Sequence, residues 1–210
     1  EAAVAAVGDV EAAHAARPDE HVERLAVGVR HQVQVLDLMG LDQSAKVQIH
    51  VGGVYGNKPA SIDRFVKQYT MLDPAIRSRL VIENDERLYA LSDCIALHEQ
   101  TGIPVIMDSF HHALLNNGER FSDLLKSVRQ TWKGSDGIPM ADYSSQEPEK
   151  RVGAHAEHIV ADDFRQFLEI TRPADFDIML EIKDKERSAL EALRIAKGDP
   201  RLVRGYPEEP

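Results

Sequence analysis

The feature that most constrains the fold is an alternation of short apolar segments with longer amphipathic ones. Five short segments are rich in Val, Ile, Leu and Met, namely residues 46–51, 79–84, 103–108, 138–144 and 176–182. Apolar strands that alternate with helices of about 10 to 15 residues indicate βαβ units around a parallel sheet buried on both faces. The pattern therefore predicts an α/β protein in which about five β/α units are visible.

Apolar residues recur at helical spacing around these segments. The helices predicted in this way cover residues 18–39, the neighbourhood of 62–69, residues 92–100, the neighbourhood of 121–128, residues 159–170 and residues 185–197. Gly40 and Gly102 are expected to end the first and the third of them, because glycine is favoured just past a helix C-terminus.

The length of the chain allows one substantial core. With 210 residues, 43% of them hydrophobic, a single domain over residues 1–210 is the default. Two architectures fit the alternation: an open doubly wound sheet, or the C-terminal portion of a (β/α)8 TIM barrel, a fold of eight strands and typically about 250 residues. The chain begins without Met and in helical sequence, which favours a barrel that is incomplete at its N-terminus.

Cysteine usage and hydropathy bear on the compartment. The single cysteine, Cys94, lies in a predicted helix, so an internal disulfide is excluded and a reducing, cytoplasmic setting is expected. An uninterrupted apolar run of roughly 18 residues is absent from the sequence, and its Ala-rich start lacks the features of a secretory signal. A membrane partner is therefore not expected.

The charge balance has two interpretations. The chain carries 25 Lys and Arg against 35 Asp and Glu, a formal net charge of −10. Taken alone, this argues against a general basic field that would hold nucleic acid. Carboxylates gathered around divalent cations would make the formal count misleading, however, because such ions are often the largest local charges in a site. The balance fits either a metal site or a plain acidic enzyme.

Side chains that can bind metals stand at the C-terminal end of every predicted strand. In chain order they are His50, Glu83, Asp108 with His111 just beyond it, Asp142 and Glu181. In barrels and open α/β sheets these strand ends converge on the ligand site. Each residue alone is also explained as a helix cap or a solvated polar group, but the series favours a shared site for Zn, Mn or Fe. His112 and His158, beside better candidates, are interpreted as exposed.

Six short motifs are familiar as a set. They are residues 49–58 (IHVGGVYGNK), 79–85 (RLVIEND), 108–112 (DSFHH), 142–146 (DYSSQ), 153–155 (GAH) and 181–186 (EIKDKE). In their order and spacing they resemble the signature motifs of UV-damage endonucleases, over roughly residues 20–195. One motif alone would be weak evidence, whereas six in register are specific.

The resemblance implies a barrel similar to xylose isomerase and to the abasic-site endonucleases, with up to three divalent ions. Manganese is expected first, with magnesium, zinc or cobalt as alternatives. The metal ligands implied by the matching motifs are His50, Glu83, Asp108, His111, His155 and Glu181. Asp142 is a further ligand candidate: some relatives carry Lys-x-His there, with a carboxylated lysine that bridges metals. Met140 cannot bridge metals, so either Asp142 substitutes with its carboxylate or the cluster is altered.

The activity that the resemblance implies is metal-dependent hydrolysis of the phosphodiester 5′ to UV photoproducts or other lesions in double-stranded DNA. The catalytic candidates are Glu83, Glu181 and Lys183. The substrate-binding candidates are Tyr55, Asn57, Lys58 and Lys185. Plainer interpretations exist, because Lys183 and Lys185 also suit the solvated start of a helix, and Gly56-Asn57 suits a simple turn.

One departure from the family pattern leaves two other functions open. The first three strands of the family should supply two more histidine ligands and a Gln-Tyr pair that inserts into DNA, and residues before His50 do not resemble those motifs. The alternatives are a sugar isomerase or epimerase of the same barrel type, and a non-catalytic fragment with an incomplete metal site. Activity assays would separate the first alternative from the nuclease, and counting bound metal would separate the second.

Overall fold

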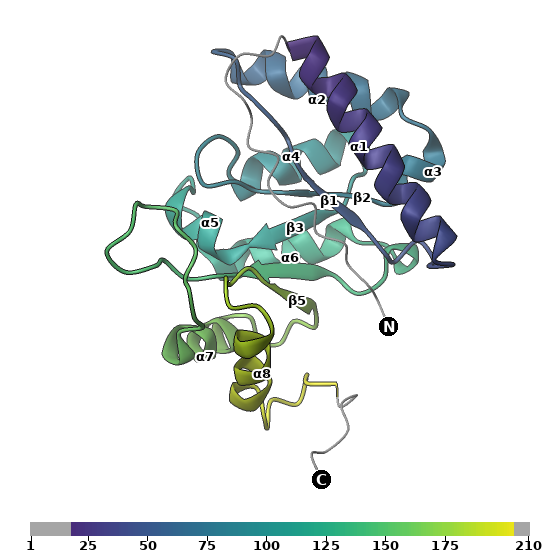
Figure 1. The fold of residues 1–210 in the computed structure, drawn as a ribbon. Helices are drawn as coiled ribbons and strands as arrows, with labels where there is room; N and C mark the ends of the chain where they lie inside the picture. The colour runs from purple at the N-terminus through teal and green to yellow at the C-terminus, as the bar shows by residue number, and fades with distance from the viewer. Residues whose placement is uncertain (1–17, 204–210) are drawn as a thin grey trace.

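The computed structural model describes the backbone of residues 18–203 and the side chains of residues 28–203. These residues form a five-stranded sheet in which neighbouring strands are parallel and follow one another in chain order (Figure 1). The strands are β1 (Val47–His50), β2 (Leu80–Glu83), β3 (Val105–Asp108), β4 (Met140–Tyr143) and β5 (Asp177–Leu180). The predicted parallel α/β class and all five predicted strands are confirmed. Residues 1–17 and 204–210 of the expected single domain lie outside the described part.

The six predicted helices are present. They are α1 (Pro18–Leu38), α2 (Lys58–Met71), α4 (Leu91–Thr101), α6 (Phe121–Thr131), α7 (Ala161–Ile170) and α8 (Glu186–Ile195). Gly40 and Gly102 follow α1 and α4 with positive φ angles of 70° and 74°, as expected of helix ends. Three short helical segments were not predicted, namely α3 (Pro74–Arg77), α5 (Ser109–Leu114) and the 3-10 turn η1 (Gly134–Asp136). They are too short to show helical periodicity.

The main core lies between the helices and one face of the sheet. Alternate residues of a strand point to opposite faces, and on this face Ile49, Ile82 and Met107 pack among apolar side chains of α4 and α6. At β4 and β5 the same face packs against α7 and α8, through Tyr143 and Phe167 among others. Removal of this apolar surface from water is the main source of stability for the sheet.

The opposite face of the sheet carries the candidate site. A smaller apolar cluster forms its floor, made of Val81, Ile106, Trp132 and Met140 with Met179 packed against it. Two residues after the strand members of this cluster come Glu83, Asp108, Asp142 and Glu181. Because side chains repeat every second residue along a strand, these four acids point to the same side as the floor. The predicted convergence of the strand ends thus follows from strand geometry.

The opposite ends of the strands are held by buried cations. Lys46, just before β1, has a fully buried side chain that donates to Asp136 Oδ1 and to the Ser78 carbonyl, each at 2.7 Å. The Arg79 guanidinium donates to the Asp37 carboxylate at 2.6 Å and to three backbone carbonyls. These contacts satisfy loop carbonyls at the end of the sheet that is remote from the candidate site, so we assign them to stability.

Among the helices of residues 18–203, none combines the length and the apolar character that crossing a membrane requires.

Candidate metal centre

Six of the seven predicted ligands lie together at the C-terminal edge of the sheet. They fall into three overlapping groups whose candidate ligand atoms lie within 4.8 Å of one another: His50, Glu83 and His111; His111, His155 and Glu181; and Glu83, Asp108, His111 and Glu181. His111 is common to all three groups. The structure therefore brings side chains from β1, β2, β3, the loop after β4 and the end of β5 to one place.

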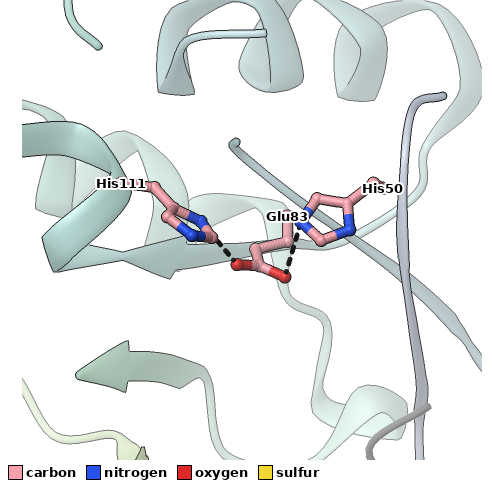
Figure 2. A group of neighbouring side chains, drawn as sticks. All are labelled: His50, Glu83 and His111. Atoms are coloured by element: carbon pink, nitrogen blue, oxygen red, sulfur yellow. Dashed lines mark ion pairs between the residues drawn. The ribbon is translucent and has the colours of Figure 1, made fainter. Parts of the chain in front are cut away.

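Glu83 lies between two imidazole rings, as Figure 2 shows. His50 Nε2 is 3.4 Å from Glu83 Oε2, and His111 Nδ1 is 3.0 Å from Glu83 Oε1. His111 Nδ1 is also 3.3 Å from Asp108 Oδ2. His50 and Glu83 end their strands, whereas His111 lies in α5, which begins directly after Asp108.

Backbone carbonyls hold two of the histidines. His111 Nδ1 lies 3.0 Å from the Asn84 carbonyl oxygen, and His155 Nδ1 lies 3.0 Å from the Glu181 carbonyl oxygen. A ring N–H that donates to a carbonyl fixes the orientation of the imidazole and leaves the other nitrogen available to a metal. This is the arrangement that metal-binding histidines usually show.

Asp108 has two roles at the same point of the chain. It ends β3, and its Oδ1 accepts a hydrogen bond at 2.8 Å from the backbone N–H of His111, so it caps α5. The cap explains why a helix starts here and why His111 turns back over the strand end. The other oxygen, Oδ2, is buried and forms no hydrogen bond.

The charges of the site are poorly balanced by the protein itself. Burial would raise the pKa of Glu83, but its contact with the His111 ring and the charge of His50 lower it. Burial would lower the pKa of His111, but the contact with Glu83 and the charge of Asp108 raise it to about 10. Burial raises the pKa of Asp108 and of Asp142 well above the ordinary value, and the charge of Glu83 adds to this.

These features fit a divalent cation. Three buried carboxylate oxygens, Glu83 Oε1, Asp108 Oδ2 and Asp142 Oδ1, form no hydrogen bond, although the first two lie within 3.3 Å of His111 Nδ1. Buried carboxylates are costly unless they are paired with cations. Imidazole and carboxylate donors without thiolates suit Mn, Fe or Zn better than softer metals.

Asp142 is linked to the cluster through a residue that the sequence did not reveal. Gln48 Nε2 donates to Glu83 Oε2 at 2.5 Å and to Asp142 Oδ2 at 2.6 Å. Asp142 is fully buried but is not a member of the three ligand groups. The position of Gln48, two residues before His50 in β1, was the available signal, because it places the amide on the same face. Met140, two residues before Asp142, belongs to the apolar floor.

Asn84 is a second residue that sequence reasoning missed. Its side chain is fully buried; Nδ2 donates to the Asp108 carbonyl at 3.1 Å, and Oδ1 accepts from the Asp108 N–H at 3.0 Å. With its own carbonyl facing His111, Asn84 connects the ends of β2 and β3. The signal was its place directly after Glu83 in a motif of polar residues.

The predicted substrate-binding residues after β1 have different surroundings. Tyr55 is half exposed, with a φ of 49° and the Arg64 guanidinium 5.1 Å from its ring centroid. Asn57 caps α2, because its Oδ1 accepts from the Ala60 N–H at 3.1 Å. Lys58 Nζ lies 2.6 Å from the Asp93 carboxylate. The last two side chains are thus engaged within the fold.

The lysines after β5 are exposed. Lys183 Nζ lies 2.9 Å from Glu157 Oε1, and Lys183 lines a hollow together with His155. Lys185 directly precedes α8 with a φ of 51°. Lys183 is therefore the catalytic candidate that combines exposure with proximity to a predicted ligand.

The interpretation of His112 as exposed was wrong. Its ring is buried in α5, and its Nε2 lies 3.2 Å from the Glu119 carbonyl oxygen, so it supports the loop after α5. His158 is exposed, as expected, and its Nδ1 lies 2.8 Å from the Asp184 carboxylate.

The fold and the site together define a parallel α/β protein with a histidine–carboxylate cluster suited to divalent metal ions. The family model described as UV-endonuclease UvdE matches residues 15–200. The chain belongs to this family, and the resemblance inferred from the six sequence motifs is confirmed.

Individual relatives agree with the family match. The UV DNA damage endonuclease of Bacillus mycoides (strain KBAB4) is 34% identical over 165 residues, which cover 78% of this chain and 52% of the relative. That of Clostridium perfringens (strain 13 / Type A) is 34% identical over 171 residues, or 80% and 42% of the two chains. A solved structure described as SacUVDE is 42% identical, with a TM-score of 0.82 over 89% of this chain and 62% of that one. The chain spans about half the length of the curated relatives it matches.

Proposed function

We propose that the chain is the C-terminal portion of a metal-dependent DNA repair endonuclease that hydrolyses the phosphodiester 5′ to UV photoproducts or other lesions in double-stranded DNA. The observation that carries the proposal is the convergence of six histidines and carboxylates in a chain of the UvdE family. The buried thiol of Cys94 supports a reducing, cytoplasmic setting.

Strand register supports the barrel part of the proposal. His50 pairs with Glu83 and Asp108 with Asp142, but Glu83 pairs with Ile106 and Asp142 with Met179. From one strand pair to the next, the last residues of the two strands are therefore alternately level and offset by two residues. The average offset is one residue per strand. A (β/α)8 barrel has a shear of about eight residues over its eight strands, which is the same average step. This stagger is what a sheet needs in order to close.

The proposed cofactor is a set of up to three divalent ions, with Mn²⁺ first and Mg²⁺, Zn²⁺ or Co²⁺ as alternatives. The residues that would hold them are His50, Glu83, Asp108, His111, His155 and Glu181, with Asp142 as a further carboxylate next to the cluster. When bound, such ions activate water and stabilise the charge that develops on phosphate oxygens.

The protein groups would orient and neutralise the substrate. Glu83 and Glu181 are the carboxylates shared between ligand groups, so we assign them the catalytic role proposed for this centre. Lys183, exposed beside His155, would contact a phosphate oxygen close to the reacting bond. Tyr55 and Lys185 would contact DNA near the site, and Asn57 and Lys58 would act by holding the loop after β1 in shape.

An incision assay tests the proposal. A duplex with a single abasic site or a UV photoproduct is incubated with the protein and Mn²⁺, with and without excess chelator, and the products are sized to locate the cut. Metal-dependent incision 5′ to the lesion supports the proposal. Turnover of a ketose or aldose panel without incision would identify a sugar isomerase or epimerase instead. Absence of bound metal in elemental analysis, with both assays negative, would identify a non-catalytic fragment.

A further inference from the structure

A group of cationic side chains borders the candidate metal centre on the loop between β4 and α7, residues 144–160. A hollow of about 440 Å³ opens there, lined by Lys150, Arg151, Gly153, Ala154, His155 and Lys183. Three of these residues are cationic, and a fourth, His155, is a predicted metal ligand. The volume is in the range of about 300 to 1,000 Å³ that is usual for ligand pockets.

We propose that Lys150, Arg151 and Lys183 form a subsite for a backbone phosphate of nucleic acid beside the metal centre, and that Glu157 holds the two lysines in place until the phosphate displaces it. The inference rests on the proposed function, because it takes a nucleic-acid strand as the ligand. It adds Lys150, Arg151 and Glu157 to the residues that act on the substrate.

Glu157 contacts the two lysines that line the hollow, as a phosphate bound there would. Its Oε1 lies 2.9 Å from Lys150 Nζ and 2.9 Å from Lys183 Nζ. The two ammonium groups, one from the loop and one from the end of β5, are therefore within twice that distance of each other. Two cations this close repel each other, and an anion between them offsets the repulsion. A phosphodiester presents two unbridged oxygens and can replace the carboxylate in that position.

The loop is built to hold these cations next to the metal centre. The Gln146 side chain donates to the Arg151 carbonyl at 3.0 Å and accepts from the Gly153 N–H at 2.9 Å. The Lys183 N–H donates to the Ala156 carbonyl at 3.2 Å, which ties the loop to the segment after β5. His155, within the same loop, faces the Glu181 carbonyl. The backbone of the loop that carries these cations is thus held next to the predicted ligands by hydrogen bonds within the fold.

Acidic residues of the same loop offset part of this charge. The loop also contains Glu147 and Glu149. The Glu147 carboxylate accepts a hydrogen bond from the Glu157 N–H at 2.6 Å, which holds it inside the loop, and its charge also acts on Lys150. Glu149 is exposed, and Glu149 and Glu147 are not among the residues that line the hollow. In a chain with a net charge of −10, a local group of three cations beside the cluster is the electrostatic feature that suits a polyanion.

Salt-dependent DNA binding tests the subsite without relying on incision. An undamaged fluorescent duplex is titrated with the full chain in Mn²⁺ at a series of KCl concentrations. Each phosphate contact contributes about 0.9 to the slope of log K against log salt. We expect the variant Lys150→Gln/Arg151→Gln to lower the slope by about 0.9, the value for one phosphate contact, and to weaken binding about tenfold at about 0.1 M salt. Glu157→Gln should tighten binding by roughly three- to tenfold, because the competing carboxylate is removed.

The matched control is Lys126→Gln/Arg129→Gln, which makes the same charge change on the exposed side of α6. Its slope should equal that of the unchanged chain. All variants must keep the melting temperature and the manganese content of the parent. A Lys150→Gln/Arg151→Gln slope equal to the control, or no duplex binding by the parent at low salt, overturns the subsite. The Lys150→Gln/Arg151→Gln variant could lower the slope of log K against log salt as expected while the parent fails to incise a lesion duplex. That result would count against the proposed function but not against the phosphate subsite.

Discussion

His50 and Glu83 are register partners across β1 and β2, and their side chains meet on the face that carries the candidate site, with His50 Nε2 3.4 Å from Glu83 Oε2. The pair is set by the parallel pairing of two buried strands, because both residues are the last of their strands. The first half of the candidate site is therefore as rigid as the sheet. The second half, His155 and Glu181, depends on a loop and on the segment that follows β5.

Replacement of Glu181 by Gln tests the second half. Glu181 belongs to two of the three ligand groups, and the amide is nearly isosteric but lacks the negative charge of a ligand. We expect an unchanged fold, a lower metal content and a loss of metal-dependent incision by about a hundredfold or more. Glu99→Gln, on the exposed side of α4, is the control. Unchanged metal content together with unchanged activity would rule Glu181 out as a ligand.

Asn84 is expected to act as a positioning residue. Asn84→Ala removes both hydrogen bonds to the Asp108 backbone and leaves a buried N–H and a buried carbonyl unsatisfied, at a cost of roughly 2 to 4 kcal/mol in unfolding free energy. Because the backbone of Asp108 loses its support, Mn²⁺ affinity should fall about 10- to 100-fold. Chemical denaturation and metal titration are the two measurements. A purely structural role would lower stability but leave the Mn²⁺ affinity of the folded protein unchanged.

The sequence predicted the strands and their acidic or imidazole ends for a physical reason. Buried parallel strands must be apolar, so a polar residue such as Glu83 or Asp108 at the end of such a run is conspicuous. The roles of Gln48 and Asn84 were not predicted, because a single amide side chain does not stand out in the sequence in this way. Its importance depends on which groups it connects in the folded protein. His112 was misinterpreted because a histidine next to a better candidate gives no sign of its burial. The stagger of the strand ends comes from pairing between distant segments and has no local signature.

The buried pair Lys46 and Asp136 should dominate stability at the other end of the sheet. Asp136→Ala leaves the fully buried Lys46 ammonium without its counterion, and breaking such a pair costs about 3 to 5 kcal/mol. For a chain of this size we expect a fall in melting temperature of roughly 6 to 20 °C. The double variant Lys46→Met/Asp136→Ala removes the charge together with its partner and should recover most of the loss. No recovery would show that Asp136 stabilises the fold through other contacts.

Asp199 gives the fold a defined response to acid. The hydrogen bond from the Arg201 side chain holds the pKa of Asp199 well below its ordinary range, and Arg201 also donates to the Leu168 and Ala174 carbonyls. A carboxyl group with a lowered folded-state pKa stabilises the protein fully above its unfolded pKa of about 3.9, and this contribution is lost as the pH falls through the folded value. Asp199→Asn should therefore cost about 1 to 2 kcal/mol at pH 7.

The pH dependence of that difference is the test. Unfolding free energies of the parent and of Asp199→Asn are measured by denaturant titration between neutral pH and pH 3, and their difference should narrow progressively below about pH 4. A gap that stays constant over this range would mean that the charge of Asp199 does not contribute. Asp162→Asn provides the comparison, because Asp162 pairs with Arg165 at an exposed position of α7 and should change stability little.

Removal of the Tyr55 side chain should weaken DNA binding without lowering the stability of the fold. The φ of 49° at Tyr55 is unfavourable for a residue with a side chain, yet its ring packs so closely on Gly53 that a Cβ there would lie 2.9 Å from Tyr55 Cζ. An exposed aromatic ring held in this way beside the end of β1 suits stacking on an unpaired base. Such stacking contributes about 1 to 3 kcal/mol per base.

Tyr55→Gly should relieve the backbone and leave the melting temperature unchanged or raised. The same variant should weaken binding to a duplex that contains an unpaired base by about five- to a hundredfold, whereas Tyr55→Phe keeps the ring and should bind as the parent does. Anisotropy titrations of the three proteins at one salt concentration make the comparison. Equal affinities for the parent and Tyr55→Gly would show that the strained backbone of Tyr55 serves the loop alone, because a residue that stacks on DNA cannot be lost without a change in binding.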